Sequence, residues 1–127
     1  MKLLLDTHVF LWFIAGSQAL SADLRDGIRD PANSVFLSPV AIWEALVKYR
    51  LGKLPLPVSP ELYLPEQRRR HRIDTLPLDE PSVARLAGLP DLHRDPFDRM
   101  LVCQALEHGL TLATVDPTVR AYPVPVW

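Results

Sequence analysis

Short runs of apolar residues alternate with longer amphipathic segments along this chain. Short apolar runs are typical of buried strands, and apolar positions spaced three and four apart are typical of helices. Strands are predicted over residues 2–5, 34–37, 73–78, 110–115 and 124–127. Helices are predicted over residues 9–14, 21–28, 39–51, 59–72, 80–89 and 96–108, with an interruption at Pro65. This alternation predicts an α/β fold built on a mainly parallel central sheet.

Proline and glycine mark the ends of these elements. The chain has 13 prolines among its 127 residues. Three pairs predict a capping residue followed by proline in the first helical turn: Ser38-Pro39, Asp95-Pro96 and Asp116-Pro117. Gly16, Gly52 and Gly109 follow predicted helices and are expected to end them.

Length and composition predict one domain over residues 1–127 with an ordinary hydrophobic core. The single cysteine, Cys103, lies in an apolar helical run and is predicted to be a buried free thiol.

No apolar run approaches the ~20 residues of a membrane span, so we expect a cytoplasmic protein with no membrane contact. The net charge of −1 does not indicate a uniformly basic nucleic-acid-binding surface, although bound metal or clustered basic residues would supply positive charge locally.

Two acidic residues follow predicted strands. Asp6 comes directly after the run Leu3–Leu5, and Asp116 comes directly after the strand predicted over residues 110–115. Sites in parallel α/β sheets form beyond the carboxyl ends of strands, where the strand order reverses. Either residue would also serve as a helix N-cap, and the sequence leaves both roles open.

Two further acids fall on apolar helix faces. Glu44 lies within the stripe formed by Val40, Trp43, Val47 and Leu51. A lone buried carboxylate is costly, so Glu44 must be protonated, paired or metal-bound unless it reaches solvent.

Asp98 repeats this pattern at the start of the next long helix. It heads the face made by Leu101, Val102 and Ala105, where the helix dipole also favours an acid. Asp95 lies three residues earlier and is interpreted first as the N-cap before Pro96.

Together these acids predict a metal site. Carboxylates crowded into one cleft raise one another's pKa unless a cation offsets their charge. A set of carboxylates without His or Cys partners suits Mg²⁺, with Mn²⁺ as the alternative. Such ions activate water and stabilise the leaving oxygen in phosphodiester cleavage.

Four segments of the chain resemble the acidic motifs of PIN-domain proteins, and the VapC-like toxins among them most. They are Leu3-Leu4-Leu5-Asp6-Thr7-His8, Ser38-Pro39-Val40-Ala41-Ile42-Trp43-Glu44, His93-Arg94-Asp95-Pro96-Phe97-Asp98-Arg99-Met100-Leu101-Val102 and Leu112-Ala113-Thr114-Val115-Asp116. The resemblance covers essentially the whole chain and implies a single PIN-like nuclease domain, folded as a three-layer α/β/α sandwich. It implies that the core acids and metal ligands are Asp6, Glu44 and Asp98, with Asp116 as the fourth and Asp95 as an extra acid of open role. Thr7, Ser38 and Thr114 are implied as hydroxyl neighbours that orient carboxylates or metal-bound waters.

The same resemblance implies a function. It is that of a magnesium-dependent endoribonuclease, the toxin of a toxin–antitoxin pair, which cleaves RNA with metal-activated water. The implied partners are a second copy of the chain and a cognate VapB-like antitoxin whose tail enters the acidic cleft. DNA would be contacted only through the complex with the antitoxin.

Basic and aromatic residues leave more than one interpretation open. Arg68, Arg69 and Arg70 begin a cationic run that is either a solvated helix surface or a rim that contacts phosphates. Arg94 and Arg99 flank the third motif and would pair with the carboxylates or with a scissile phosphate. Lys48, Arg50 and Lys53 could extend this basic surface, and Trp12, Trp43 and Phe97 are spaced like core residues.

Three other functions compete with the toxin ribonuclease. One is a catalytically weak nucleic-acid-binding partner that regulates transcription with an antitoxin, and another is a PIN nuclease with a role other than toxin. A phosphatase with an aspartyl nucleophile at Asp6 is disfavoured, because such enzymes generally have a second Asp two positions later, where this chain has His8.

Overall fold

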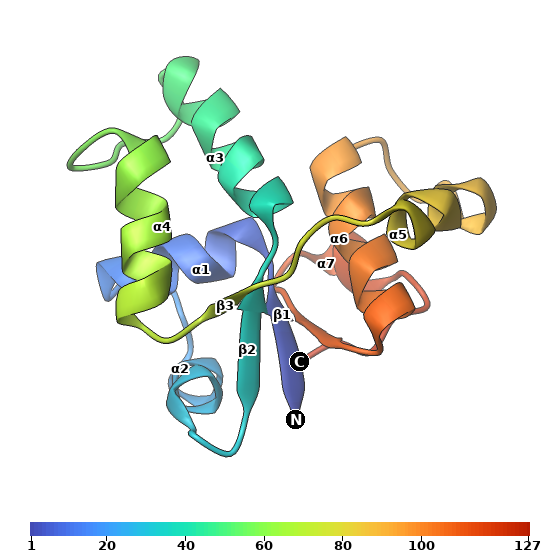
Figure 1. The fold of residues 1–127 in the computed structure, drawn as a ribbon, viewed down its shortest axis with the longest axis horizontal. Coiled ribbons are helices and arrows are strands. Elements are labelled where there is room, and N and C mark those ends of the chain that lie inside the picture. The colour runs from blue at the N-terminus through green and yellow to red at the C-terminus, as the bar shows by residue number, and fades with distance from the viewer.

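The computed structural model describes residues 1–127 and is built around a four-stranded, all-parallel sheet (Figure 1). The strands are β1 (Lys2–Leu5), β2 (Ser34–Leu37), β3 (Asp74–Thr75) and β4 (Thr111–Ala113), in the order β3-β2-β1-β4. The strand order reverses beside β1, so the carboxyl end of β1 is where a site is expected. The predicted parallel α/β fold is confirmed.

Helices cover both faces of this sheet. They are α1 (Thr7–Ala15), α2 (Ala22–Arg29), α3 (Pro39–Arg50), α4 (Pro60–Arg70), α5 (Glu80–Ala84), α6 (Pro96–His108) and α7 (Pro117–Arg120), with a 3₁₀ turn at Arg85–Gly88. Helices α1, α2 and α4 lie on one side of the sheet, and α5, α6 and α7 lie on the other (Figure 1). Helix α3 leaves the end of β2 and contacts α1 and α4 on one side and α6 on the other. No helix is both long enough and apolar enough to span a membrane.

The β1 side chains divide the core into two clusters. Leu3 and Leu5 point into the cluster beneath α1, α2 and α4, whereas Leu4 points into the cluster beneath α6. Alternate residues of a strand face opposite sides, so burial of all three leucines requires a layer on each face of the sheet. This confirms the predicted three-layer sandwich. Cys103 is buried in the second cluster as a free thiol, as predicted.

All three predicted cap-and-proline pairs begin helices. The Ser38 hydroxyl accepts a hydrogen bond from the Val40 N–H at 3.0 Å at the start of α3. The carboxylate of Asp95 caps α6, and that of Asp116 accepts from the Thr118 N–H at 2.8 Å to cap α7. These signals are local, because a cap and the N–H that it satisfies are two or three residues apart.

Several predicted boundaries are wrong. The strand predicted over residues 73–78 is confined to Asp74–Thr75, since Pro77 has no N–H with which to extend the ladder. The strand predicted over residues 124–127 is a single bridge between Leu112 and Val126. The helix expected over residues 80–89 ends at Ala84 and continues as the 3₁₀ turn.

The predicted interruption at Pro65 is also wrong. Helix α4 continues through this proline to Arg70. A proline inside a helix removes one hydrogen bond and strains the preceding turn. The neighbouring Leu64, which is buried in the core, anchors the helix across that defect.

The buried face of α3 differs from the predicted stripe. Of the four apolar residues expected there, only Val40 is buried, while Trp43 is 57% exposed and Leu51 is 62% exposed. The buried face is instead formed by Val40, Ala41, Glu44 and Ala45. The two alanines allow close packing, so α3 turns its small residues and Glu44 inward. Glu44 is therefore buried as predicted, but Trp43 is not a core residue and packs edge-on against Phe97.

Candidate active site

One cavity of about 360 Å³ opens at the carboxyl end of β1. It collects residues from the ends of β1 and β4 and from the helices α1, α3 and α6. The lining residues are Asp6, Thr7, His8, Trp12, Glu44, Lys48, Asp95, Asp98, Val115, Asp116 and Pro117. The structure thus brings the four predicted acids and the extra acid Asp95 to the same cavity.

Asp6 joins the end of β1 to the start of α1. Its Oδ1 accepts a hydrogen bond from the Val9 N–H at 2.9 Å, so it caps α1 while its carboxylate lies in the cavity. Only 6% of the residue is exposed, and burial raises the pKa of its carboxyl group. Hydrogen bonds from Thr114 and Val9 partly oppose this rise. The sequence left open whether Asp6 is a helix N-cap or a site residue, and the two roles are compatible.

Glu44 is buried on the inner face of α3, with 2% of its surface exposed. One carboxylate oxygen, Oε1, accepts a hydrogen bond from the Thr7 hydroxyl. The other, Oε2, forms an ion pair with the Lys48 ammonium group one turn later in the helix. A buried carboxylate is costly without such partners, so Thr7 and Lys48 supply the contacts that compensate the burial of Glu44.

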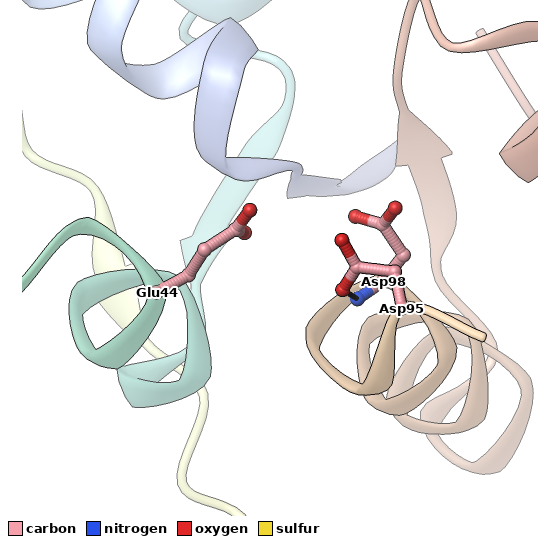
Figure 2. A group of neighbouring side chains, drawn as sticks. All are labelled: Glu44, Asp95 and Asp98. Carbon is pink, nitrogen blue, oxygen red and sulfur yellow. Dashed lines mark hydrogen bonds between the residues drawn. The ribbon is translucent and has the colours of Figure 1, made fainter. Parts of the chain in front are cut away.

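Asp95 and Asp98 face Glu44 across the cavity from the first turn of α6 (Figure 2). Each of the three residues offers one carboxylate oxygen, and these oxygens lie within 4.8 Å of one another. Asp95 also caps α6, accepting hydrogen bonds from the Phe97 and Asp98 N–H groups at 2.9 and 3.1 Å. Asp95 therefore caps α6 and belongs to the acidic cluster at the same time.

Crowding and burial shift the titration of Asp98. Burial raises the pKa of its carboxyl group to about 6, and the charges of Asp95 and Glu44 add to the rise. A hydrogen bond to His93 opposes it. A nearby cation would stabilise the charged form of this carboxylate and lower its pKa again.

Lys48 is the single lysine or arginine of this cavity. Burial acts to lower the pKa of Lys48, but the hydrogen bond and charge of Glu44, with the charges of Asp95 and Asp98, raise it overall. Sequence reasoning placed Lys48 only in a basic surface and missed this pairing. The available signal was its spacing of four residues from Glu44 on one helix.

The acidic cluster fits a hard divalent cation. Its donors are carboxylate oxygens, with no thiolate and no imidazole among the three that converge. Oxygen donors of this kind suit Mg²⁺ and Mn²⁺. Five carboxylates line the cavity against one lysine, so the site also has the negative charge that such an ion would neutralise.

The remaining predicted residues lie around this cluster. Asp116 lines the cavity but is exposed and stays outside the three converging oxygens. The Thr114 side chain forms a hydrogen bond with Asp6. Its hydroxyl oxygen accepts another from the Asp116 N–H at 3.2 Å. Thr7 and Thr114 thus orient acids, whereas Ser38 does not: it is fully buried and caps α3.

None of the predicted substrate-binding arginines lines the acidic cavity. Arg68 donates to the Ile73 carbonyl, and Arg70 pairs with Glu66 on the surface of α4. Arg69 is exposed near the end of the same helix, and Arg94 lines a neighbouring groove. Arg99 does not pair with the carboxylates of this site, because it donates to the Pro90 carbonyl and pairs with Asp91 in the loop before α6. Its predicted contact with a phosphate stays a prediction.

Comparisons with known proteins identify the family of this fold and site. The model of the family described as "PIN domain" matches residues 3–124. Ribonuclease VapC22 from Mycobacterium tuberculosis is 30% identical over 131 aligned positions, which cover 98% of this chain and 97% of that protein. Ribonuclease VapC16 from the same organism is 38% identical over 70 residues, covering 54% of this chain and only half of that protein.

Solved structures agree with this match. VapBC2 from Rickettsia felis, bound to a promoter DNA fragment, has a chain that superposes with a TM-score of 0.74 at 14% identity, covering 100% of this chain and 98% of the other. FitAcB from Neisseria gonorrhoeae gives a TM-score of 0.61 at 26% identity, covering 98% and 96%. The likeness to the VapBC2 chain, at 14% identity, shows a shared fold alone. The match to the family model over residues 3–124 does not depend on it. The resemblance drawn from the four acidic motifs is thereby confirmed, and the chain belongs to the PIN domain family.

Proposed function

We propose that this chain is a divalent-metal-dependent endoribonuclease and acts in the cytoplasm as the toxin of a toxin–antitoxin pair. The observation that carries the proposal is the convergence of Glu44, Asp95 and Asp98 within 4.8 Å, beside Asp6 at the end of β1. The ribonuclease names of the two related mycobacterial proteins support RNA as the substrate. The toxin–antitoxin complexes among the structures of the same fold support the biological role.

The proposed metal ligands are Asp6, Glu44 and Asp98, with Asp95 within reach and Asp116 at the rim. We infer Mg²⁺ as the ion, with Mn²⁺ able to replace it. When bound, such an ion supplies a water of lowered pKa and electrostatic stabilisation of a departing oxygen. The protein groups hold the carboxylates at the cavity, through Thr7 and Lys48 on Glu44 and through Thr114 on Asp6.

Lys48 has a second role in this proposal. Its side chain is one-third exposed and its ammonium group retains its charge, because the surrounding acids raise its pKa. It can therefore contact a phosphate oxygen of RNA while one ion pair still holds Glu44. We infer direct hydrolysis, because the lining holds no serine or cysteine and its one hydroxyl group, that of Thr7, donates to Glu44.

Protein partners belong to the same proposal. We infer a homodimer and a cognate VapB-like antitoxin, with DNA bound only through the antitoxin complex. The exposed apolar residues of α3, namely Trp43, Val47 and Leu51, support a protein–protein surface beside the site.

The proposed function is tested by removing and restoring the metal. Cleavage of total bacterial RNA by the purified chain should stop in EDTA and return on addition of excess Mg²⁺ or Mn²⁺. Sequencing of new 5′ ends should show discrete cuts that identify the RNA target. Cleavage that persists in EDTA, or no cleavage of any RNA with either metal, would contradict the proposal.

Thr7 gives a second prediction at the same site. Substitution Thr7→Val keeps the shape of this buried side chain but leaves Glu44 Oε1 without its donor. Because partners that orient metal ligands are worth about 10–100-fold, we expect cleavage to fall by that factor. Thr7→Ser retains the hydroxyl and should keep most of the activity in the same assay. Equal activities for the two variants would show that this hydrogen bond has no role.

A further inference from the structure

Asp98 is connected to Tyr122, which follows α7, by a line of hydrogen bonds. His93 Nε2 lies 3.1 Å from Asp98 Oδ2, and His93 Nδ1 lies 2.8 Å from the hydroxyl oxygen of Tyr122. The Arg99 Nη1 lies 3.0 Å from that same oxygen. We call Arg99, Tyr122 and His93 the positioning chain.

The arginine end of the positioning chain is fixed by other contacts. Arg99 donates to the Pro90 carbonyl at 2.8 Å and pairs with Asp91 at 3.3 Å. Its side chain is only 13% exposed, and its guanidinium carbon lies 6.0 Å from the centroid of the Tyr122 ring. The guanidinium therefore ties the loop before α6 to Tyr122, and this loop carries His93.

The chemistry of the groups orders two of these hydrogen bonds. Arg99 has only donors, so the Tyr122 oxygen accepts from it. An ionised carboxylate only accepts, so His93 Nε2 donates to Asp98 Oδ2 in the charged cluster. Asp98 Oδ1 takes part in none of these bonds.

We propose that the positioning chain holds the His93 ring in place, so that its Nε2 contact fixes Asp98 as a metal ligand. One oxygen of Asp98 is anchored and the other is left for the cation, as expected for a ligand held by an outer hydrogen-bond donor. This inference rests on the proposed function, because it assumes that the acidic cluster binds a divalent metal.

The test compares Mn²⁺ binding, without RNA, by the full chain and four variants. Tyr122→Phe removes only the hydroxyl, and His93→Leu removes the donor to Asp98. Both should weaken Mn²⁺ affinity about 10–100-fold. His93→Gln supplies an amide donor in place of Nε2–H and should stay within about threefold of the unsubstituted chain. Tyr63→Phe on α4, outside the positioning chain, is the matched control and should not change the affinity.

Rescue of Mn²⁺ affinity by His93→Gln, measured against His93→Leu, is the readout that a purely structural role would not move. Circular dichroism would establish that each variant is folded. Folded Tyr122→Phe and His93→Leu proteins with unchanged Mn²⁺ affinity would overturn the positioning chain. An unsubstituted chain that binds no Mn²⁺ would instead overturn the proposed function on which it rests.

Discussion

Asp98→Asn is expected to reduce metal-dependent RNA cleavage by about a thousandfold or more. Partners that only orient a metal ligand are worth about 10–100-fold, so loss of a ligand's charge should cost more. Asp98 is the acid that faces both Asp95 and Glu44, and asparagine keeps its shape while removing its negative charge. The measurement is single-turnover cleavage of the target RNA in saturating Mg²⁺, with growth arrest in bacteria as a parallel readout.

Asp26→Asn is the matched control for this experiment. Asp26 is an exposed acid on α2, and it does not line the acidic cavity. The substitution makes the same change in net charge, so it should leave cleavage and growth arrest unchanged. If the Asp98→Asn enzyme cleaved RNA as fast as the control, Asp98 would not be a metal ligand.

The same Asp98→Asn substitution is expected to stabilise the protein in the absence of metal. The pKa of Asp98 is raised from 3.8 to about 6, so the folded protein keeps a proton that the unfolded chain releases. The stabilising contribution is therefore fully present below pH 3.8 and is lost as the pH rises to about 6. Asparagine has no such titration. After a discount for partial exposure to solvent, we expect the free energy of unfolding at pH 7 to rise by about 1–2 kcal/mol.

Urea denaturation in EDTA between pH 4 and pH 8 measures this difference in the free energy of unfolding. Added Mg²⁺ should reverse the order of the two proteins, so that the unsubstituted chain becomes the more stable. A ligand at 100 times its dissociation constant adds about 2.7 kcal/mol to the stability of a protein that binds it only when folded. The unsubstituted chain should gain this stability, whereas Asp98→Asn should gain much less. An Asp98→Asn protein less stable than the unsubstituted chain in EDTA at pH 7 would show that burial of the Asp98 carboxylate among the other acids does not destabilise the metal-free fold.

The local features of this protein were predictable from the sequence because their causes are local. A capping side chain and the N–H that it satisfies are close neighbours, so Ser38, Asp95 and Asp116 could be assigned as caps before any fold was known. The acids Asp6 and Glu44 stood out for a related reason. A carboxylate beside an apolar run conflicts with its surroundings, and that conflict is visible along the chain.

Prediction was weaker where a face or an edge depended on packing. On α3 the large apolar residues suggested one buried face, but the helix buries a face with two alanines and Glu44. The choice between these faces depends on how closely α3 can approach its neighbours. That distance is set by α1, α4 and α6, which the periodicity of α3 does not describe.

By itself, the sequence determined the parallel α/β architecture, the helix caps and the set of acids to be considered, since periodicity, proline placement and misplaced charges are all properties of short segments. Only the tertiary structure decided which oxygens converge and what holds them. Thr7 reaches Glu44 across 37 positions and His93 reaches Tyr122 across 29, so these bonds exist only once the strands and helices have packed. Such contacts join residues whose separation along the chain carries no periodic signal, and the burial that makes them strong is a property of the assembled core.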